Sequence, residues 1–247
     1  MTAPVLVALA PGSPDARSRR SLAELVAEVR RTRPDLRVEA AVLAHGSPSL
    51  DDTLARLADE GVEEVVVVPL LLVEPHLAGA DLAGALDRAG RRHPRLRLRA
   101  SAVLGPEPSL LEVLDLRLRD ALAAARVREL DALVLAAQGT ADALANQAVA
   151  RLARLWGTHH RLPVSAAYAV SAPPATGEAV RAFRGEGRRH IAVGSLFWSP
   201  GPLHDRASEL ALEAGAVAVS APLGAHPSLA RLVLARYAVG AVELVPV

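Results

Sequence analysis

The amino-acid sequence predicts an α/β protein made of two similar lobes, each a parallel sheet flanked by helices. Short apolar runs alternate with longer amphipathic stretches, the apolar runs lack any polar alternation, and the whole order of elements occurs twice. Strands that are buried on both faces of a parallel sheet have this continuous apolar character. Short connections between strand and helix favour right-handed βαβ units.

The first half contains four candidate strands separated by helical patterns. In the first such pattern Leu22, Leu25, Val26 and Val29 recur at i, i+3, i+4 and i+7, and the opposite face carries Arg and Glu. This spacing predicts an amphipathic helix with one buried face. The strands expected in this half are Val5–Ala10, Val38–Leu43, Val65–Val73 and Leu96–Leu104.

The second half repeats the first in a diverged form. The segment Val7–Ser13 matches Val134–Thr140, and Gly105–Leu110 matches Gly224–Leu229. We therefore expect an N-terminal lobe over residues 1–125 and a C-terminal lobe over 130–247. The strands expected in the second half are Leu133–Ala137, Val164–Ala169, His190–Leu196 and Val217–Ser220.

Composition excludes several classes of protein. The 247 residues are 51% hydrophobic and 22% charged with a net charge of +1, which predicts a globular chain with no nucleic-acid or membrane partner recognised through bulk charge. There is no Cys, so disulfides and thiolate metal sites are excluded. The apolar run at Val5–Ala10 lacks the basic start of a signal peptide and is too short to span a bilayer, which predicts a cytoplasmic protein. The oligomeric state stays open.

Residues that follow the strands are the candidates for a binding site, because ligands of open parallel sheets bind outside the carboxyl ends of the strands. In the first half these segments are Pro11-Gly12-Ser13, His45-Gly46-Ser47 and Glu74-Pro75-His76. In the second half they include Gln138-Gly139-Thr140 and the stretch that ends at His204. Neither GxxxxGK[ST] nor GxGxxG occurs, so a nucleotide cofactor is not expected.

In order and spacing, these segments resemble the sirohydrochlorin cobaltochelatases and ferrochelatases, the small class II chelatases, in their long, internally duplicated form. The resemblance covers nearly the whole chain and rests on the strand Val65–Leu72, on His76 and Asp81 after it, and on Gly224–Leu229. It implies insertion of Fe2+ or Co2+, as the substrate metal, into a sirohydrochlorin-type tetrapyrrole. Such a reaction serves sirohaem or cobalamin biosynthesis.

The resemblance also implies an altered metal site. The family pattern has His-Gly-Ser after the first strand, an acidic residue after the second and His after the third. Matched residue by residue, these positions hold Pro11, Ala44 and His76 in the first half. The second half holds Gln138, Ala169 and His204. Only the third-strand His is present in each half.

On this basis we expect His76 and His45 to act in catalysis, because a neutral imidazole can bind a metal weakly and accept a proton near neutral pH. The expected metal ligands are His76, His45 and His204, since imidazole suits Fe2+ and Co2+. The turns that follow the strands have free backbone N–H groups that attract the carboxylates of a tetrapyrrole. The expected tetrapyrrole-binding residues are Gly12, Ser13, Gly46, Ser47, Gln138 and Gly139.

Other readings of these residues stay open. Asp81 and Asp205 also suit helix starts, where the helix dipole stabilises a carboxylate. His93 falls at a solvated helix end, and His159-His160 falls in a polar linker, where a metal pair is the less favoured reading. Loss of both His-Gly-Ser histidines leaves an alternative function, that of a non-catalytic tetrapyrrole- or metal-binding protein.

Overall fold

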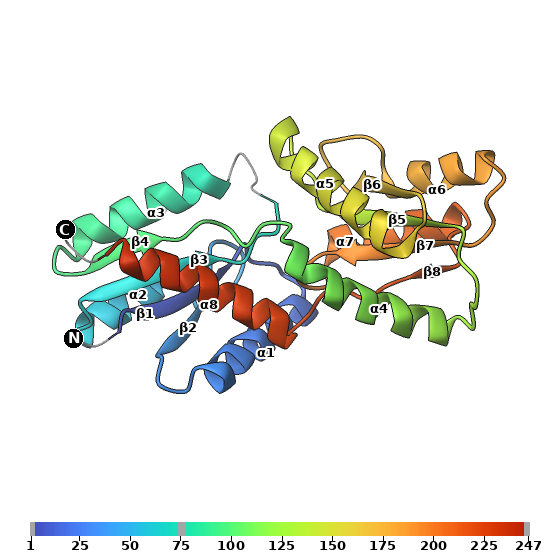
Figure 1. The fold of residues 1–247 in the computed structure, drawn as a ribbon. Helices are drawn as coiled ribbons and strands as arrows, with labels where there is room; N and C mark the ends of the chain where they lie inside the picture. The colour runs from blue at the N-terminus through green and yellow to red at the C-terminus, as the bar shows by residue number, and fades with distance from the viewer. Residues whose placement is uncertain (1–2, 74–77, 245–247) are drawn as a thin grey trace. The chain divides into compact units, whose positions relative to one another are not determined.

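The computed structural model describes residues 3–73 and 78–244, except for the side chains of residues 78–81. Two four-stranded sheets are present, with strand orders β2-β1-β3-β4 and β6-β5-β7-β8, and all neighbouring strands run parallel (Figure 1). The strands are β1 (Val5–Ala10), β2 (Val38–Val42), β3 (Glu64–Pro69), β4 (Arg97–Ala100), β5 (Ala132–Ala137), β6 (Val164–Tyr168), β7 (Ile191–Leu196) and β8 (Ala218–Val219). The predicted fold class is thereby confirmed.

Helices connect the strands and cover the sheets. They are α1 (Ala16–Thr32), α2 (Leu50–Asp59), α3 (Ala78–Arg92), α4 (Leu111–Ala124), α5 (Ala143–His160), α6 (Thr176–Gly185), α7 (Pro202–Glu213) and α8 (Pro227–Val242), with a short 3-10 helix at Pro108–Leu110 before α4. Every strand expected from the sequence is present, with ends that differ by a few residues. The largest differences are in β3, which ends at Pro69 and not at Val73, and in β4, which ends at Ala100 and not at Leu104.

The two sheets share one register, as the sequence repeat predicts. In the first sheet Leu9 lies opposite Ala41 on β2 and Pro69 on β3. In the second sheet Ala136 lies opposite Ala167 on β6 and Ser195 on β7. The duplicated sequence therefore gives two sheets with the same strand order and the same pairing.

Each sheet is apolar on both faces and therefore needs helices on both. In the first sheet, Val7 and Val67 share one buried cluster with Leu54 and Leu57 of α2 and with α3. On the opposite face the helix α8 packs on α1 and β3, and Gly240 of α8 meets Val66 of β3. The second sheet has a matching cluster with α6 and α7 on one face.

The packing of the chain divides it into two compact units whose limits differ from the lobes 1–125 and 130–247 expected from the sequence. Unit 1 comprises Met1–Gly105 and Ala225–Val247, and unit 2 comprises Pro106–Gly224. The helix α4, which follows β4 of the first sheet in the chain, packs on β7 and β8 of the second sheet. The helix α8, which follows β8, packs on β3 and β4 of the first. The two halves thus exchange their last helices.

An arginine anchors each exchanged helix to the loop of its new sheet. In unit 2, Arg117 of α4 donates from Nε and Nη2 to the carbonyl oxygen of Leu223, at 3.2 and 2.9 Å. In unit 1, Arg236 of α8 donates to the carbonyl oxygens of Val103 and Leu104, at 2.8 and 2.7 Å. Both loops directly precede the point where the chain passes into the other unit. The repeat therefore includes the anchors as well as the sheets.

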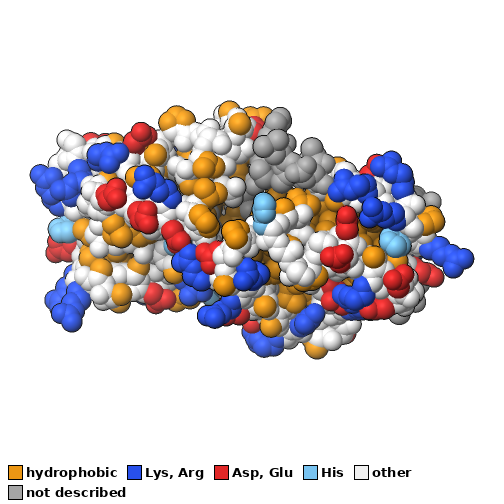
Figure 2. Space-filling view, turned by 180° about the vertical axis from the view of Figure 1, so that it is seen from behind, with side chains coloured by type: hydrophobic (Ala, Val, Ile, Leu, Met, Phe, Trp, Pro, Cys, Tyr) orange, Lys and Arg blue, Asp and Glu red, His pale blue; other side chains and the backbone are white. Residues whose placement is uncertain are grey.

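The surface carries charges of both signs in mixed order. On the face shown in Figure 2, arginines and carboxylates are interspersed, with hydrophobic side chains between them. In unit 1, for example, Arg56 lies 3.0 Å from both Glu39 and Glu60. No helix in the described part of the chain has the length and apolar character needed to cross a bilayer.

The position of α8 on the first sheet predicts opposite effects for one substitution at two helical glycines. A Cβ at Gly240 would lie 2.7 Å from Cγ1 of Val66, whereas a Cβ at Gly90 of α3 meets nothing within 4 Å. We expect Gly240→Leu to lower the free energy of unfolding by about 2–3 kcal/mol through overpacking. Gly90→Leu should raise it by up to about 1 kcal/mol through helix propensity. Urea unfolding of both variants measures the difference, and two changes of the same sign would contradict the packing of α8 described here.

Candidate functional site

The turn that follows β1 is held in place by its own side chains. Ser13 Oγ accepts a hydrogen bond from the Asp15 backbone N–H at 3.1 Å. The Asp15 side chain accepts from Arg17 N at 2.8 Å and caps α1. The helix therefore begins at Ala16, three residues beyond the Gly12-Ser13 turn.

The loops that follow β1 and β2 touch through their backbones. The ladder between the strands continues beyond their ends, with Leu43 N donating to Ala10 O at 2.9 Å and Ala44 N to Pro11 O at 3.1 Å. Gly12 has a φ of +95°, and a Cβ there would overlap the carbonyl oxygen of Ala44. The close approach of the two loops thus requires glycine at this position.

His45 lies at the carboxyl edge of the first sheet, where the sequence places it. Its φ of +49° is left-handed, and its side chain is exposed. Gly46 follows, where a Cβ would lie 3.2 Å from Cγ2 of Val42. Ser47 and Pro48 then lead to Ser49, which caps α2 by accepting from Asp52 N at 3.1 Å. The structure thus brings His45, Gly12, Ser13, Gly46 and Ser47 to one edge.

The second sheet repeats this edge in unit 2. Ala169 N donates to Ala137 O at 2.9 Å, and Val170 N donates to Gln138 O at 3.0 Å. A Cβ at Gly139 would overlap the carbonyl oxygen of Val170, as at Gly12 in the first unit. The residue after Val170 is Ser171, whose φ of +64° matches that of His45.

This repeat corrects one sequence comparison. By hydrogen bonding, Ala44 corresponds to Val170, whereas the sequence comparison placed Ala44 and Ala169 at equivalent positions. His45 corresponds to Ser171, so the imidazole at this position belongs to unit 1 alone among the described equivalents. The one-residue error arose because the loops that follow β2 and β6 share few identical residues.

The turn after β5 is fixed by residues that sequence reasoning did not select. Asn146 of α5 accepts from Thr140 N at 3.1 Å and donates from its side-chain amide to Thr140 O at 2.6 Å. Tyr168 donates from its hydroxyl to Asn146 O at 2.9 Å. Asp142 caps α5 by accepting from Leu144 N at 2.8 Å. Polar residues soon after the strand-end turn, such as Asp142 and Asn146, were the available signal, whereas Tyr168 at the end of β6 gave none.

His204 has an unusual environment in unit 2. It is the third residue of α7, and its side chain is 13% exposed. Its ring lies edge-on to Phe197 with centroids 5.5 Å apart, and Nδ1 lies 3.5 Å from Oδ1 of Asp205. Its Nε2 is buried and has no hydrogen-bond partner among residues 3–73 and 78–244. A buried polar atom rarely lacks a partner, because leaving it unpaired is costly.

The remaining predicted residues divide into two groups. Gln138 is half-buried at the same edge of the second sheet as His204 and Gly139, because β5 and β7 are neighbours. Glu74 and His76 lie outside the described residues, as does the side chain of Asp81. The roles of His45, His76 and His204 as metal ligands therefore remain a prediction.

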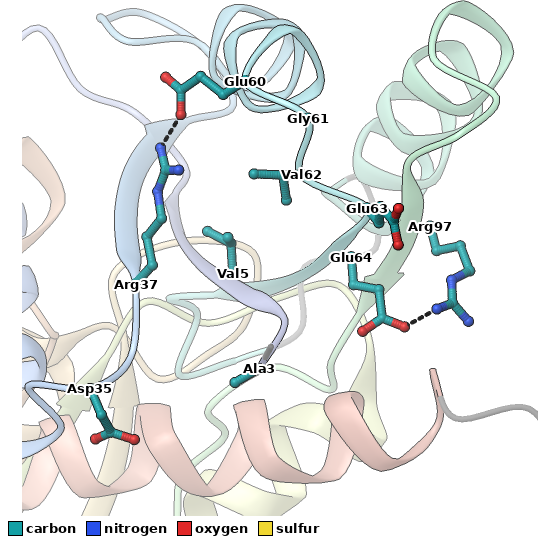
Figure 3. A pocket seen from close by; sticks show the side chains of 10 residues that line it. All are labelled: Ala3, Val5, Asp35, Arg37, Glu60, Gly61, Val62, Glu63, Glu64 and Arg97. Carbon is teal, nitrogen blue, oxygen red and sulfur yellow. Dashed lines mark hydrogen bonds and ion pairs between the residues drawn. The ribbon is translucent and has the colours of Figure 1, made fainter. Parts of the chain in front are cut away.

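A hollow of about 810 Å3 lies at the opposite edge of the first sheet, where the strands begin (Figure 3). Arg37 pairs there with Glu60 at 2.5 Å, and Arg97 pairs with Glu64. Hydrogen bonds from Arg37 and Arg56 lower the pKa of the Glu60 carboxyl from its usual value. Two ion pairs and the further carboxylates of Asp35 and Glu63 line this hollow, and its edge is not the one where parallel sheets bind ligands.

Comparison with known proteins identifies the family of this chain. The CbiX family model matches residues 5–121 and 132–239, one match to each half of the chain. The chain belongs to the CbiX family. No protein in the curated set matches this CbiX sequence.

Several solved structures share the CbiX fold of this chain over almost its full length. SirB from Bacillus subtilis with Fe3+ has a TM-score of 0.80 at 19% identity, covering 98% of this chain and 96% of SirB. The sirohydrochlorin chelatase SirB of Bacillus subtilis subspecies spizizenii in complex with cobalt has a TM-score of 0.78 at 17% identity, with the same coverage. A CbiX described as the terminal enzyme of sirohaem biosynthesis in denitrifying bacteria has a TM-score of 0.67 at 20% identity, covering 99% of this chain and 100% of that one.

The contact between the two loops of the first sheet predicts a graded effect of Gly→Ala. Gly61 has a φ of +79° with nothing near its Cβ position, so Gly61→Ala incurs only the backbone cost of about 1–2 kcal/mol. Gly12→Ala incurs this cost and the overlap with Ala44 O, which adds about 1–3 kcal/mol. Chemical denaturation of both variants measures the difference. Equal losses would show that the two loops do not meet at Gly12.

Proposed function

We propose that this chain inserts Fe2+ or Co2+ into a sirohydrochlorin-type tetrapyrrole. The observation that carries the proposal is the match of the CbiX family model to both halves, at residues 5–121 and 132–239. The fold it shares with SirB, whose structures hold Fe3+ and cobalt, supports the same chemistry. Sirohaem or cobalamin biosynthesis would use the product.

The reaction needs groups that bind a metal weakly and accept protons. Two pyrrole N–H protons leave the macrocycle for each divalent ion that enters, so charge is conserved. A neutral imidazole can give its lone pair to the metal before insertion, or take up a departing proton. We assign this work to His76 and His45, with His204 as a further metal ligand in unit 2. The unpartnered Nε2 of His204 supports its part of the assignment.

Recognition of the substrate carboxylates falls to the turns in this proposal. Gly12, Ser13, Gly46 and Ser47 follow two neighbouring strands of the first sheet, and Gln138 and Gly139 follow β5 of the second. The helix starts themselves are less available, because the carboxylates of Asp15 and Asp142 already accept from their N–H groups. We therefore place the substrate carboxylates on the turns.

Two positions favour a second candidate function, tetrapyrrole or metal binding without turnover. Pro11 and Gln138 stand directly after the first strand of each sheet, where the family pattern has His. Neither side chain can accept a proton near neutral pH. A chain that had lost this step would still bind sirohydrochlorin at the same edges.

Replacement of single histidines tests the assignment of His76. We expect His76→Ala to lower the rate of Co2+ insertion into sirohydrochlorin by on the order of 100-fold, because it removes a metal-binding and proton-accepting group. His93→Ala, at the half-buried residue that follows α3, should leave the rate unchanged. The measurement is the initial change in absorbance above the uncatalysed rate. If both variants reacted at equal rates, His76 would not be the catalytic group.

Restoring the family histidine separates the two functions. We expect Pro11→His to raise the chelation rate by on the order of 100-fold in a chelatase, since Gly12 and Ser13 still form the turn beside it. Pro34→His, in the exposed loop between α1 and β2, is the matched control. Thermal unfolding checks that the turn tolerates the change. A folded Pro11→His protein that binds sirohydrochlorin tightly without any increase in rate would favour the binding protein.

A further inference from the structure

A carboxylate and two imidazoles converge in unit 2, apart from the strand-end turns. Asp115 belongs to α4, and His159 and His160 form the end of α5. His160 Nε2 lies 2.7 Å from Asp115 Oδ1, and His159 Nε2 lies 3.6 Å from Asp115 Oδ2. All three ligand atoms lie within 4.8 Å of one another. The histidines are helical, and the sequence-based assignment of this pair to a polar linker was wrong.

The Asp115 carboxylate is oriented by a buried neighbour. Trp156 of α5 is fully buried and donates from Nε1 to Asp115 Oδ1 at 2.7 Å. Its ring lies edge-on to His160, with centroids 5.6 Å apart. The absence of a side chain at Gly194 of β7 makes room for the indole, since a Cβ there would lie 2.5 Å from Cη2. A hydrogen-bonded carboxylate beside a metal position is the usual means of fixing its ligand oxygens.

We propose that Asp115, His159 and His160 form a binding site for a divalent transition-metal ion of the Zn2+ or Co2+ type. Imidazole nitrogen and carboxylate oxygen are the ligands that such ions take in proteins. Both imidazoles present the same atom, Nε2, to one carboxylate. With His159 67% exposed, water reaches the position and completes the coordination.

The distances fit an ion after a small adjustment. Ligand atoms about 2.0–2.2 Å from a tetrahedral ion are roughly 3.4 Å apart, close to the 3.6 Å between His159 and Asp115. The 2.7 Å between His160 and Asp115 is a hydrogen bond, in which Nε2 donates because a carboxylate can only accept. When the ion enters, the Nε2–H proton leaves and Nδ1 takes up a proton, so the imidazole stays neutral, and the pair separates by less than about 1 Å. At Nε2 the ion therefore replaces a proton.

The proposed site is distinct from the strand-end site. The end of α5 leads into β6, so His159 and His160 lie at the edge of the second sheet where strands begin. Gln138 and His204 lie at the edge where strands end. A bound ion would join α4 to α5, two helices that reach the second sheet from different halves of the sequence. The site does not depend on chelatase activity.

Fluorescence of the chain without an affinity tag tests the site. The two tryptophans are Trp156 and Trp198, so Trp198→Phe leaves an indole that shares its hydrogen-bond acceptor with the site. Titration with Co2+, which is paramagnetic, should quench this emission in a saturable manner through one ion at this site, in addition to any Co2+ bound at the strand-end site. The visible absorption of bound Co2+ should appear in parallel.

Variants in the Trp198→Phe background decide the outcome. His159→Ala should weaken the Co2+ affinity seen by Trp156 by on the order of 100-fold. His190→Ala is the matched control, an exposed histidine 4.0 Å from Asp131, and should change nothing. Asp115→Asn keeps a hydrogen-bond acceptor for Trp156 and should also weaken binding. The proposal is overturned if Co2+ leaves Trp156 emission unchanged, or if the His159→Ala and parent titrations coincide.

Discussion

The structure depends on the burial of two parallel sheets on both faces. Val66 and Val67 of β3 point to opposite faces and are both fully buried. No sheet of this kind is stable with one layer of helices, because its second face would remain apolar and exposed. In unit 1, α2 and α3 cover one face, and α1 with α8 covers the other. In unit 2, α4 and α5 have the corresponding places. The exchange of α4 and α8 is how each sheet completes its second layer.

Sequence reasoning predicted the sheets well and the helix exchange not at all. Runs such as Val65–Val68 have no polar alternation and indicate strands buried on both faces. The spacing in α8 indicates an apolar helix, but it does not indicate which of two equivalent sheets the helix covers. That choice depends on the loops at Gly105 and Gly224 and on the anchors Arg117 and Arg236. The sequence shows an arginine after each repeated Pro-Ser-Leu segment, but it does not show which loop that arginine will contact.

The same limit applies to the site. The carboxyl edge of a parallel sheet is predictable from topology, so His45 and Gln138 lie where expected. A single sequence does not show that His45 has a left-handed backbone or that Gly12 lies against the backbone of Ala44. Both features depend on tertiary structure. Alignment of the two halves by residue type misplaced the equivalent of Ala44 by one residue. The hydrogen bonds between the strand ends corrected it. The position of His204 was expected from the sequence. The burial of its Nε2 without a partner depends on its packing beside Phe197, which the sequence does not show.

The exchange of helices also determines the order in which the chain can fold during synthesis. Unit 2 is continuous, from Pro106 to Gly224, so all of its sheet and covering helices are available once residue 224 has emerged from the ribosome. Unit 1 begins earlier but lacks α8 until residues 227–242 have been made. The first sheet, although its strands are translated first, therefore exposes part of one apolar face for longer than the second. Exposed apolar surface of this kind is prone to aggregation. The face of the first sheet under α8 is therefore the last to be covered as the chain is made.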